Sequence, residues 1–546
     1  MSESPTSPAP SKPDNRMPLS AAFIVGNEAA ERFSYYGIRS ILAVYITGEV
    51  MRGGLGQTKD TATTIIHLFI FANYFLPLLG AWLSDRLIGR YWTILSLSLV
   101  YCLGNGVLAC SDLLTTVNAK LACLAAGLGL IALGSGGIKP CVSAFMGDQF
   151  KPEQGHLLQK AYGAFYWAIN FGSFFSFLVV PWVKDHHGYG WAFGVPGVFM
   201  ALATLIFWLG TRHYTRVAPA RETKTAGFLK VLLGAFRSQA RLTLAPILNV
   251  LTSLVLPLLA MMVFTALALV HDLTPAMRGL GWAALAAVGC WYLLIVGLSL
   301  TGRLELPDHY WNAARPRFTE GEISAARSVS PILFVFALVP VFWALFDQTT
   351  STWVLQGKTM VPVKVFGYTI DAEEMQSANP AFVMILVPLL TLGVYPRLGR
   401  LATPLRRMSA GMFLAAASYV LVAWLQHRLD AGAQLSILWQ MLPYLILTTG
   451  EVLLSTTGLE FAFAEAAPSM RSTIMSFWLL TVAFGNLLVA AITRVLGGGD
   501  VEAGSVTSGR FLLYAGLTAV VGVLFSIVAS RYRYRHPTFK ALAGEP

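Results

Sequence analysis

Charged residues are scarce in this sequence. Asp, Glu, Lys and Arg make up 12% of its 546 residues, and 55% of the residues are hydrophobic, whereas an average soluble protein carries roughly 25% charged residues. This composition excludes soluble globular, fibrous and disordered proteins, and it indicates a large lipid-facing surface. Cysteine is scarce too. The five cysteines lie within apolar runs without CxxC or Cys/His spacing, which argues against a disulfide framework, a metal site or redox chemistry.

Long apolar runs occupy most of the chain. A helix needs roughly 20 residues to cross ~30 Å of hydrocarbon, and it satisfies its own backbone hydrogen bonds there. Nearly all of the fourteen runs reach this length, so the sequence predicts an all-α polytopic membrane protein with fourteen transmembrane helices. The runs cover residues 18–48, 62–84, 92–111, 119–146, 161–182, 191–211, 244–270, 280–302, 328–356, 378–396, 404–426, 435–464, 472–494 and 511–530.

The basic residues that give the chain its net charge of +11 lie mostly on one side of the predicted membrane. An even number of helices puts both termini on one side, and 26 of the 39 lysines and arginines lie in the termini and in the connections of that side. The positive-inside rule therefore predicts that both termini are cytoplasmic. The same distribution argues against a nucleic-acid partner.

Two basic connections enclose an apolar helix pair at 244–302. Without this pair, six helices precede and six follow, and the strings SDRLIGR and YPRLGR each follow the second helix of a half. Six plus six helices with matching turns is typical of a transporter with parallel repeats. We expect a disordered cytoplasmic tail at 1–17, an N-terminal six-helix bundle at 18–212, a linker with the inserted pair at 213–327, a C-terminal six-helix bundle at 328–532 and a cytoplasmic tail at 533–546.

Ionisable side chains interrupt several of the runs. A charge at the bilayer centre costs roughly 2.5–3.5 kcal/mol on insertion scales, so such residues usually face a wet cavity and pair with one another. Five predicted helices from both halves contribute polar groups at membrane depth. The main ones are Glu28, Glu31, Arg32, Arg39, His67, Tyr74, Lys139, Asp347 and Glu451.

A structural role is the alternative for several of these residues. Glu28 and Arg32 lie four residues apart, so they can form an intrahelical ion pair. His67 can be a hydrogen-bonded core residue, although the titration range of histidine suits a coupling proton. Lys139 and Asp347 can form a structural salt bridge, because either charge alone would be strongly penalised.

Glu451 has no charged residue within a helical turn, which leaves the amine of a ligand as a plausible partner. Aromatic side chains also lie in these runs. They belong either to an interface belt or to packing, but polar neighbours at similar depth favour a cavity lining for most of them. These aromatic residues are Tyr35, Tyr36, Tyr74, Tyr166, Trp343 and Trp478.

The string EAAERFSYYG at residues 28–37 resembles the ExxERFxYYG signature of the proton-dependent oligopeptide transporters, the POT or PTR family of the major facilitator superfamily. The segment from Gly80 to Arg86 also resembles the general facilitator motif. Further segments resemble the family in the expected order across both halves: GSGGIKPCVSAFMGDQF, FYWAINFGS, FWALFDQTTSTW, SANPAFVMILVP and GEVLLSTTGLEFAFAEAAPSM.

The resemblance implies a major facilitator fold and proton-driven uptake of di- and tripeptides by alternating access. By similarity, Glu28, Glu31 and Arg32 form the proton-coupling cluster. His67 matches the proton-handling histidine of animal peptide transporters. Glu451 resembles the residue that holds the peptide amino terminus.

The resemblance also implies a gate and a pocket. Lys139 and Asp347 belong to a salt-bridge switch, and Arg39 is a candidate extracellular-gate partner of Asp347. The residues that match pocket positions are Tyr35, Tyr74, Asn170, Trp343, Asn379 and Trp478. A zwitterionic peptide needs an anion at one end and a cation at the other, and Glu451 with Arg32 or Lys139 would satisfy this requirement.

Two departures from the family pattern stand out. The connection at 427–434 is short, whereas animal members carry a large extracellular domain there, and together with the inserted pair this indicates a bacterial member. The string DQTTSTW stands where DQQGSxW is common, so pocket or gate detail is open at this point.

We therefore expect a proton-coupled peptide symporter of the bacterial inner membrane, functional as a monomer, with no cofactor or metal. A related transporter of an amino acid, nitrate or a peptide-like drug is the first alternative, but the full ExxER set and Glu451 favour a peptide. The second alternative is a membrane-embedded enzyme with Glu28, Glu31 and His67 as acid, base or metal ligands.

Overall fold

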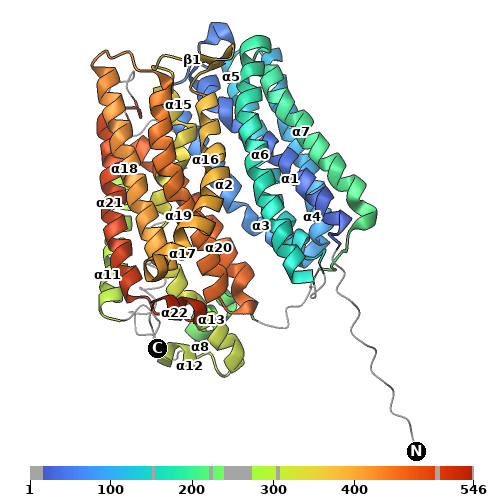
Figure 1. The fold of residues 1–546 in the computed structure, drawn as a ribbon, viewed down its shortest axis with the longest axis vertical. Helices are drawn as coiled ribbons and strands as arrows, with labels where there is room; N and C mark the ends of the chain where they lie inside the picture. Colours follow the sequence, from blue (N-terminus) through green and yellow to red (C-terminus); the bar gives the residue numbers. More distant parts are fainter. Residues whose placement is uncertain are drawn as a thin grey trace, which may run out of the picture.

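A computed structural model describes residues 16–150, 154–219, 226–238, 274–302, 308–497 and 504–543. Long helices run side by side through the described chain (Figure 1). The long helices are α1 (Leu19–Thr47), α2 (Lys59–Phe75), α4 (Arg90–Ala109), α5 (Val117–Gly147), α6 (Gly155–His187), α7 (Tyr189–Leu209), α11 (Pro275–Leu300), α13 (Glu320–Phe336), α18 (Pro404–Asp430), α19 (Met441–Glu465), α20 (Arg471–Leu496) and α21 (Ser508–Arg531).

Shorter elements complete or connect the long helices. The one sheet of the described chain is an antiparallel hairpin of β1 and β2. These shorter elements are α3 (Pro77–Leu83), α8 (Phe228–Ser238), α12 (Asp308–Asn312), α14 (Pro340–Phe346), the 3-10 turns η7 (Asp347–Thr350) and η8 (Glu374–Ser377), α15 (Thr352–Gly357), β1 (Val363–Val365), β2 (Tyr368–Ile370), α16 (Ala378–Pro388), α17 (Tyr395–Leu398) and α22 (Pro537–Ala543).

The helices coincide with the predicted runs. In the described residues, eleven helices are long and apolar enough to cross a membrane, or twelve if the bent pair formed by α13 and α14 is one span. α1 has 29 residues, or about 44 Å at 1.5 Å per residue, so it is also long enough despite its four charges. The remaining predicted run, 244–270, lies outside the described residues, as do residues 1–15 of the predicted tail.

Local sequence sets where many helices begin. Thr58, Thr116, Thr274 and Thr507 each accept a hydrogen bond from a backbone N–H of the first turn, which satisfies a donor that the helix itself leaves free. Thr319 forms a full capping box ahead of α13. The predicted single run 328–356 is broken: the chain bends by 45° between α13 and α14, where Pro340 lacks an N–H for a continuous helix.

The helices pack in two groups. In the first, called the amino-terminal group, α1 packs on α6 and α7, and α4 packs on α5 and α7. In the second, the carboxy-terminal group, α18 packs on α19 and α21, and α14 packs on α20. Figure 1 shows the two groups beside each other, the first in blue to green and the second in yellow to red. α2 and α20 form the largest contact between the groups.

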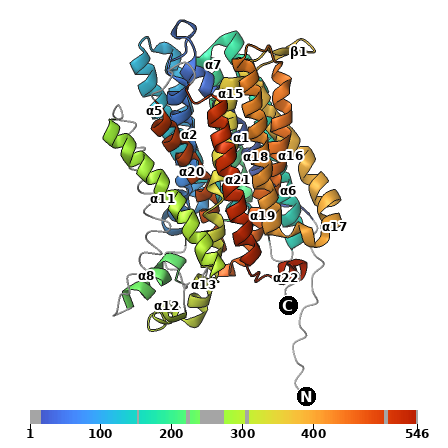
Figure 2. The same cartoon turned by 90° about the vertical axis from the view of Figure 1, so that its left-hand side faces the viewer.

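The two ends of the molecule differ. The end that carries β1 and β2 is called the hairpin end below, and α8, α12 and α22 lie at the opposite end (Figures 1 and 2). At the hairpin end, α6 contacts η8 and α16, and α1 contacts α15. The Tyr368 hydroxyl of β2 donates to the Leu178 carbonyl of α6, and Gln376 donates to the Ser40 carbonyl of α1. The hairpin end is therefore closed between the two groups.

Part of the predicted linker packs on the carboxy-terminal group. α11, the second helix of the predicted pair, lies obliquely along α21 and α20 (Figure 2). α8 lies against α13 and α12, where the Tyr310 hydroxyl donates to the Leu232 carbonyl and the Phe228 ring contacts Phe477 of α20. These contacts attach the linker to one group of helices.

The predicted carboxy-terminal tail also contains a docked segment. Glu465 at the end of α19 is 3% exposed, and it accepts hydrogen bonds from the Tyr532 hydroxyl and from the backbone N–H groups of Arg535 and His536. The Phe461 ring packs on Tyr532 and Tyr534. Helix α22 follows directly, so residues 532–543 are held against the end of α19.

Candidate binding site

A cavity of about 180 Å³ lies between the two groups of helices. α1, α2 and α6 form one wall, and α14, η7, η8, α16, α19 and α20 form the other. Both polar and aromatic side chains line it: Tyr36, Arg39, Tyr74, Tyr166, Ile169, Asn170, Ser173, Phe177, Trp343, Phe346, Asp347, Thr349, Thr350, Gln376, Asn379, Glu451, Ser455 and Val482.

Glu451 supplies a carboxylate to the carboxy-terminal wall. Its Oε2 accepts a hydrogen bond from Asn379 Nδ2 at 2.8 Å, and the same amide donates to Thr448 at 3.1 Å. Glu451 forms no ion pair among the described residues. α19 reaches this position because Gly450 packs on Gly411 of α18, where a Cβ on either glycine would lie within 3.0 Å of the other's carbonyl oxygen.

The three charged residues of the EAAER string lie together on α1 but do not line the cavity. Arg32 Nε lies 2.9 Å from Glu28 Oε1 and 2.5 Å from Glu31 Oε2. The Ser135 hydroxyl of α5 donates to Glu31 Oε1 at 3.3 Å. All three charged residues are buried. The intrahelical ion pair considered from the sequence is therefore present, within a three-residue cluster.

Arg39 and Asp347 meet across the two groups at the hairpin side of the cavity. Arg39 Nη2 of α1 donates to Asp347 Oδ1 of η7 at 2.9 Å. Asn486 of α20 donates to Asp347 Oδ2 at 2.7 Å. Both oxygens of this buried carboxylate thus have a donor. The predicted contact between Arg39 and Asp347 is present in the structure.

His67 extends this network to α2. Asn486 uses both amide hydrogens, toward Asp347 and toward the Val482 carbonyl, so its oxygen accepts from His67 Nδ1 at 2.7 Å. The other ring nitrogen, Nε2, then accepts from the Ser351 hydroxyl at 2.9 Å. The network assigns this tautomer. His67 is thus a satisfied buried histidine that is linked to Asp347 through one amide.

Lys139 does not pair with Asp347 in this structure. Its ammonium lies over the rings of Tyr35 and Tyr74, 4.3 and 4.1 Å from their centroids. No ion-pair partner lies within 4.0 Å among the described residues, and Nζ has no hydrogen-bond partner there. Since Arg39 and Asn486 already occupy both oxygens of Asp347, the expected salt bridge is replaced by contacts with two aromatic faces.

Tyr35 and Trp478 also differ from their expected place in the pocket. Tyr35 is fully buried among Arg32, Arg39 and Lys139, and its neighbour Tyr36 lines the cavity. Trp478 packs behind the cavity, on Phe336 and on Trp343, which does line it. The other predicted pocket residues line the cavity: Tyr74, Tyr166, Asn170, Trp343, Asn379 and Glu451.

A second ionic cluster closes the hairpin end. Lys184 of α6 and Lys358 both form ion pairs with Glu373, which is 1% exposed. Lys358 also pairs with Asp371 at 2.7 Å, and Lys184 with Asp185 at 3.1 Å. Burial disfavours the Glu373 carboxylate, but the two ammonium groups outweigh burial and lower the pKa of Glu373.

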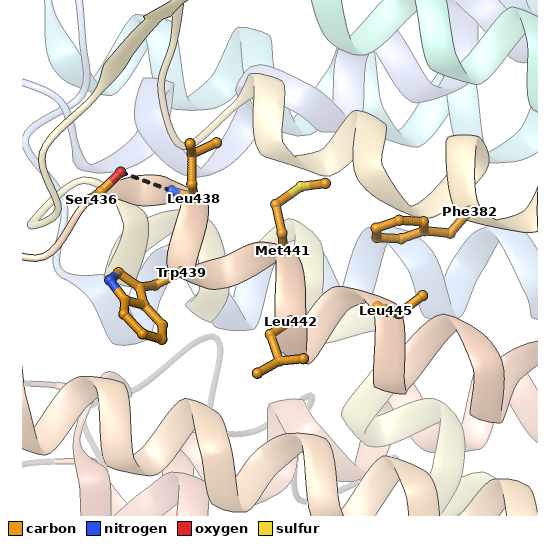
Figure 3. Close-up of a pocket in the computed structure, with 7 residues that line it drawn as sticks. All are labelled: Phe382, Ser436, Leu438, Trp439, Met441, Leu442 and Leu445. Carbon is orange, nitrogen blue, oxygen red and sulfur yellow. Dashed lines mark hydrogen bonds between the residues drawn. The ribbon is translucent and has the colours of Figure 1, made fainter.

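A larger cavity of about 530 Å³ lies on α16 and α19, away from these charged groups. Figure 3 shows its lining side chains, which come from Phe382 and from the segment 436–445. Ser436 is the one polar residue in this lining. Such a groove suits apolar chains, but it lacks the charges that a zwitterion requires, so the smaller central cavity is the candidate site. No group of three or more His, Cys, Asp or Glu side chains that could hold a metal occurs in the described ranges.

Several site residues were not identified from the sequence. Asn486 interrupts the apolar string AFGNLLVA, so its position inside a run was an available signal. Ser351 and Thr350 lie in the DQTTSTW string, and the departure of this string from the family pattern was a weaker signal for a site residue. Gln376 precedes an apolar run and carried no signal, because only the fold brings it to Ser40 of α1.

The comparisons with known proteins agree with this architecture. A family model described as POT family matches residues 91–507. Solute carrier family 15 member 1 of Canis lupus familiaris is 32% identical over 440 residues, which cover 76% of this chain and 52% of that protein. Peptide transporter family 1 of Drosophila melanogaster is 33% identical over 426 residues, which cover 76% of this chain and 48% of that protein. The chain thus spans about half the length of the curated relatives it matches.

A crystal structure of the POT family transporter PepTSo aligns with 94% of this chain and 98% of its own, with a TM-score of 0.78 and 37% sequence identity. This likeness confirms the expected all-α, multi-pass major facilitator fold. The family match spans most of both helix groups and includes all five of the further segments that resembled the family, while the EAAER string and the segment from Gly80 to Arg86 lie before it. The chain therefore belongs to the POT family.

Proposed function

We propose that this protein is a proton-coupled symporter that imports di- and tripeptides by alternating access. The observation that carries this proposal is the cavity between the two helix groups, where the Glu451 carboxylate has no ion pair among the described residues and the Tyr74 ring of the lining covers the Lys139 ammonium. Aromatic rings and the polar side chains of Asn170, Gln376 and Asn379 belong to the rest of the lining. Such a site suits a zwitterion with variable side chains. One curated relative and one solved structure carry the name peptide transporter, which supports the same substrate class.

Glu451 is the proposed partner of the peptide ammonium. Its carboxylate faces the cavity with Asn379 as its partner, so an incoming ammonium adds a charge-assisted hydrogen bond. Lys139 and Arg32, the proposed partners of the peptide carboxylate, do not line the cavity. Tyr74 lies between Lys139 and the cavity, so this ring has to move when the carboxylate binds.

The proposed proton sites are the cluster of Glu28, Glu31 and Arg32, and His67. Protonation of Glu31 removes one of the two anions that flank Arg32, and protonation of His67 reverses its hydrogen bond with Ser351. The second event changes contacts between the two groups, since Ser351 and Asn486, the partners of His67, belong to the carboxy-terminal group. A proton then favours one arrangement of the two groups by the difference in its binding free energy between them.

The proposed gate is the ion pair of Arg39 and Asp347. It joins α1 to η7 across the closed hairpin end, so this end has to lose the pair before it opens. Lys139 is the proposed alternative partner of Asp347 when Arg39 leaves. The halves that move are the proposed bundles 18–212 and 328–532, and the segment 213–327 is the linker with the inserted helices.

We further propose that the protein lies in a bacterial inner membrane as a functional monomer, with both termini cytoplasmic and the hairpin end outside. The distribution of the basic residues supports this orientation. α1 begins at the end where α7 ends, since Phe23 of α1 stacks on His213, which follows α7, and α22 lies at this end too. No cofactor is required, because the proton gradient drives uptake.

The alternatives predict different substrates. A transporter of nitrate or of single amino acids would not need a pocket for peptide side chains, and a membrane enzyme would release altered products. Uptake of labelled Ala-Ala into proteoliposomes with an inwardly directed proton gradient separates these cases. We expect intact dipeptide inside, with competition by other di- and tripeptides and none by alanine or nitrate. No accumulation above the level without a gradient would refute the proposal.

A further inference from the structure

The Arg39 guanidinium has a second acceptor beside Asp347. Its Nη2 donates to Thr350 Oγ1 at 3.2 Å as well as to Asp347 Oδ1 at 2.9 Å. Both acceptors belong to η7, which begins at one and ends at the other. All three residues are at most 5% exposed, so water does not compete freely for the guanidinium.

The direction of each hydrogen bond at Thr350 is fixed. A guanidinium can only donate, so the Thr350 oxygen accepts from Arg39. The Thr350 hydroxyl hydrogen is directed to the Asp347 carbonyl at 2.9 Å. The turn itself therefore orients the oxygen lone pair toward α1 before Arg39 arrives, which lowers the entropic cost of the contact.

Thr350 stands where the family pattern DQQGSxW has glycine, since the chain reads DQTTSTW from Asp347 to Trp353. A glycine has no side-chain acceptor. The second contact of Arg39 therefore depends on the threonine that departs from the common pattern.

We propose that Thr350 is a positioning residue of the closed hairpin end, which keeps Arg39 attached to η7 when the Asp347 carboxylate is weakened as an acceptor. This inference rests on the proposed alternating access. It predicts that the open population of the hairpin end depends on two acceptors, and that each matters more when the other is absent.

The experiment measures the opening directly. Spin labels at Met51 and Ala431, both exposed and on different groups at the hairpin end, report the distance between the groups by pulsed electron resonance. The five native cysteines are first replaced by serine or alanine. We expect Thr350→Val to increase the ratio of open to closed molecules about tenfold, the effect of losing one hydrogen bond to a charged group.

Three further variants define the role. Thr350→Ser keeps the hydroxyl and should restore the parent distribution. Thr352→Val is the matched control, because Thr352 bonds to Gln348 in the same segment and does not contact Arg39, and it should leave the distribution unchanged. In an Asp347→Asn background, Thr350→Val should open the end by a larger factor than in the parent, since Thr350 is then the main acceptor.

Equal effects of Thr350→Val and Thr352→Val, or failure of serine to restore closure, would overturn the proposal. So would the same factor in the parent and Asp347→Asn backgrounds. If the valine variant does not fold, Thr350→Gly gives the residue common in the family and serves the same comparison. A parent protein that never opens at the hairpin end would refute alternating access itself, whereas a parent that opens and a silent Thr350→Val variant would refute only the role of Thr350.

Discussion

Among the charged side chains that line the central cavity, Glu451 has the fewest partners, since Arg39 and Asp347 pair with each other. Among the described residues, its carboxylate accepts a hydrogen bond from Asn379 and forms no ion pair. A carboxylate in an enclosed site without a cation is costly, so a substrate ammonium would supply the missing charge.

Replacement of Glu451 by Gln should therefore weaken dipeptide binding by roughly ten- to a hundredfold, since one charge-assisted hydrogen bond of about 1.5–3 kcal/mol is lost. An N-acetylated dipeptide has no ammonium, so it should bind poorly to the parent and lose little more in the variant. Calorimetric titration measures both. Glu460→Gln on the same helix is the control, because Glu460 pairs with Arg407 near the surface. An equal loss for both ligands would contradict the proposed orientation.

Glu31→Gln tests proton coupling. The change leaves Arg32 with Glu28 as its one anionic neighbour within the cluster, and it removes a group that can take up a proton. We expect gradient-driven accumulation of Ala-Ala in proteoliposomes to be lost, while counterflow exchange without a gradient partly remains. Gradient-driven uptake at the parent rate would exclude Glu31 from coupling.

The sequence predicted which residues are chemically important better than it predicted where they point. Tyr35 and Tyr36 are adjacent on α1, and successive residues of a helix point about 100° apart. The sequence does not show which of the two side chains faces the cavity. The position of Lys139 is equally hard to predict, because its place between two rings depends on which donors already bind Asp347.

Helices follow the sequence more closely, because the length and apolar character of a run are properties of the run alone. α5 and α18 begin and end within a few residues of the predicted limits. The break between α13 and α14 was not predicted, although Pro340 was visible, since a proline inside a membrane helix is often tolerated when neighbouring groups satisfy the backbone. The contact between α18 and α19 depends on two distant glycines, so it became visible only in the fold.

The glycine contact gives a prediction for this helix pair. A Cβ at position 450 would lie 2.8 Å from the Gly411 carbonyl oxygen, so Gly450→Ala should force α18 and α19 apart and cost about 1–3 kcal/mol. Gly516→Ala on α21 is the control, because nothing lies within 4 Å of its Cβ, and alanine favours a helix by about 1 kcal/mol over glycine. Thermal unfolding in detergent should shift down for the first variant and not for the second. Equal shifts would show that the close contact of Gly411 and Gly450 does not determine the stability of this helix pair.

At the scale of the whole molecule, the cluster of Lys184, Lys358 and Glu373 joins the two groups at the hairpin end. Glu373→Gln would leave two ammonium groups close together without their central anion. We expect this variant to increase the open population at the Met51 and Ala431 labels. Asp185→Asn, which removes a more exposed partner of Lys184, should have a smaller effect. The reverse order would show that the buried carboxylate is not the main contact.

The same cluster predicts a dependence on pH. Because the two lysines lower the pKa of Glu373, its contribution to closure is complete above the usual pKa of a carboxyl group and is lost as the pH falls through the lowered value. The distance distribution of the parent should thus keep this contribution between pH 5 and 8 and lose it in stronger acid. The difference between the acid response of the parent and that of Glu373→Gln gives the contribution of Glu373 alone, without those of Asp371, Asp185 and the other carboxylates. An identical acid response in both proteins would contradict this assignment.

The docking of residues 532–543 on Glu465 has a practical consequence for protein production. A purification tag or fluorescent fusion joined close to Ala543 would pull on a segment whose backbone N–H groups are held by the last residue of α19, the helix that also carries Glu451. A fusion partner attached there through a short spacer would disturb the contacts between this segment and α19. A flexible spacer of about 20 residues, with a root-mean-square span of roughly 25 Å, would separate the fusion partner from this segment and leave these contacts intact.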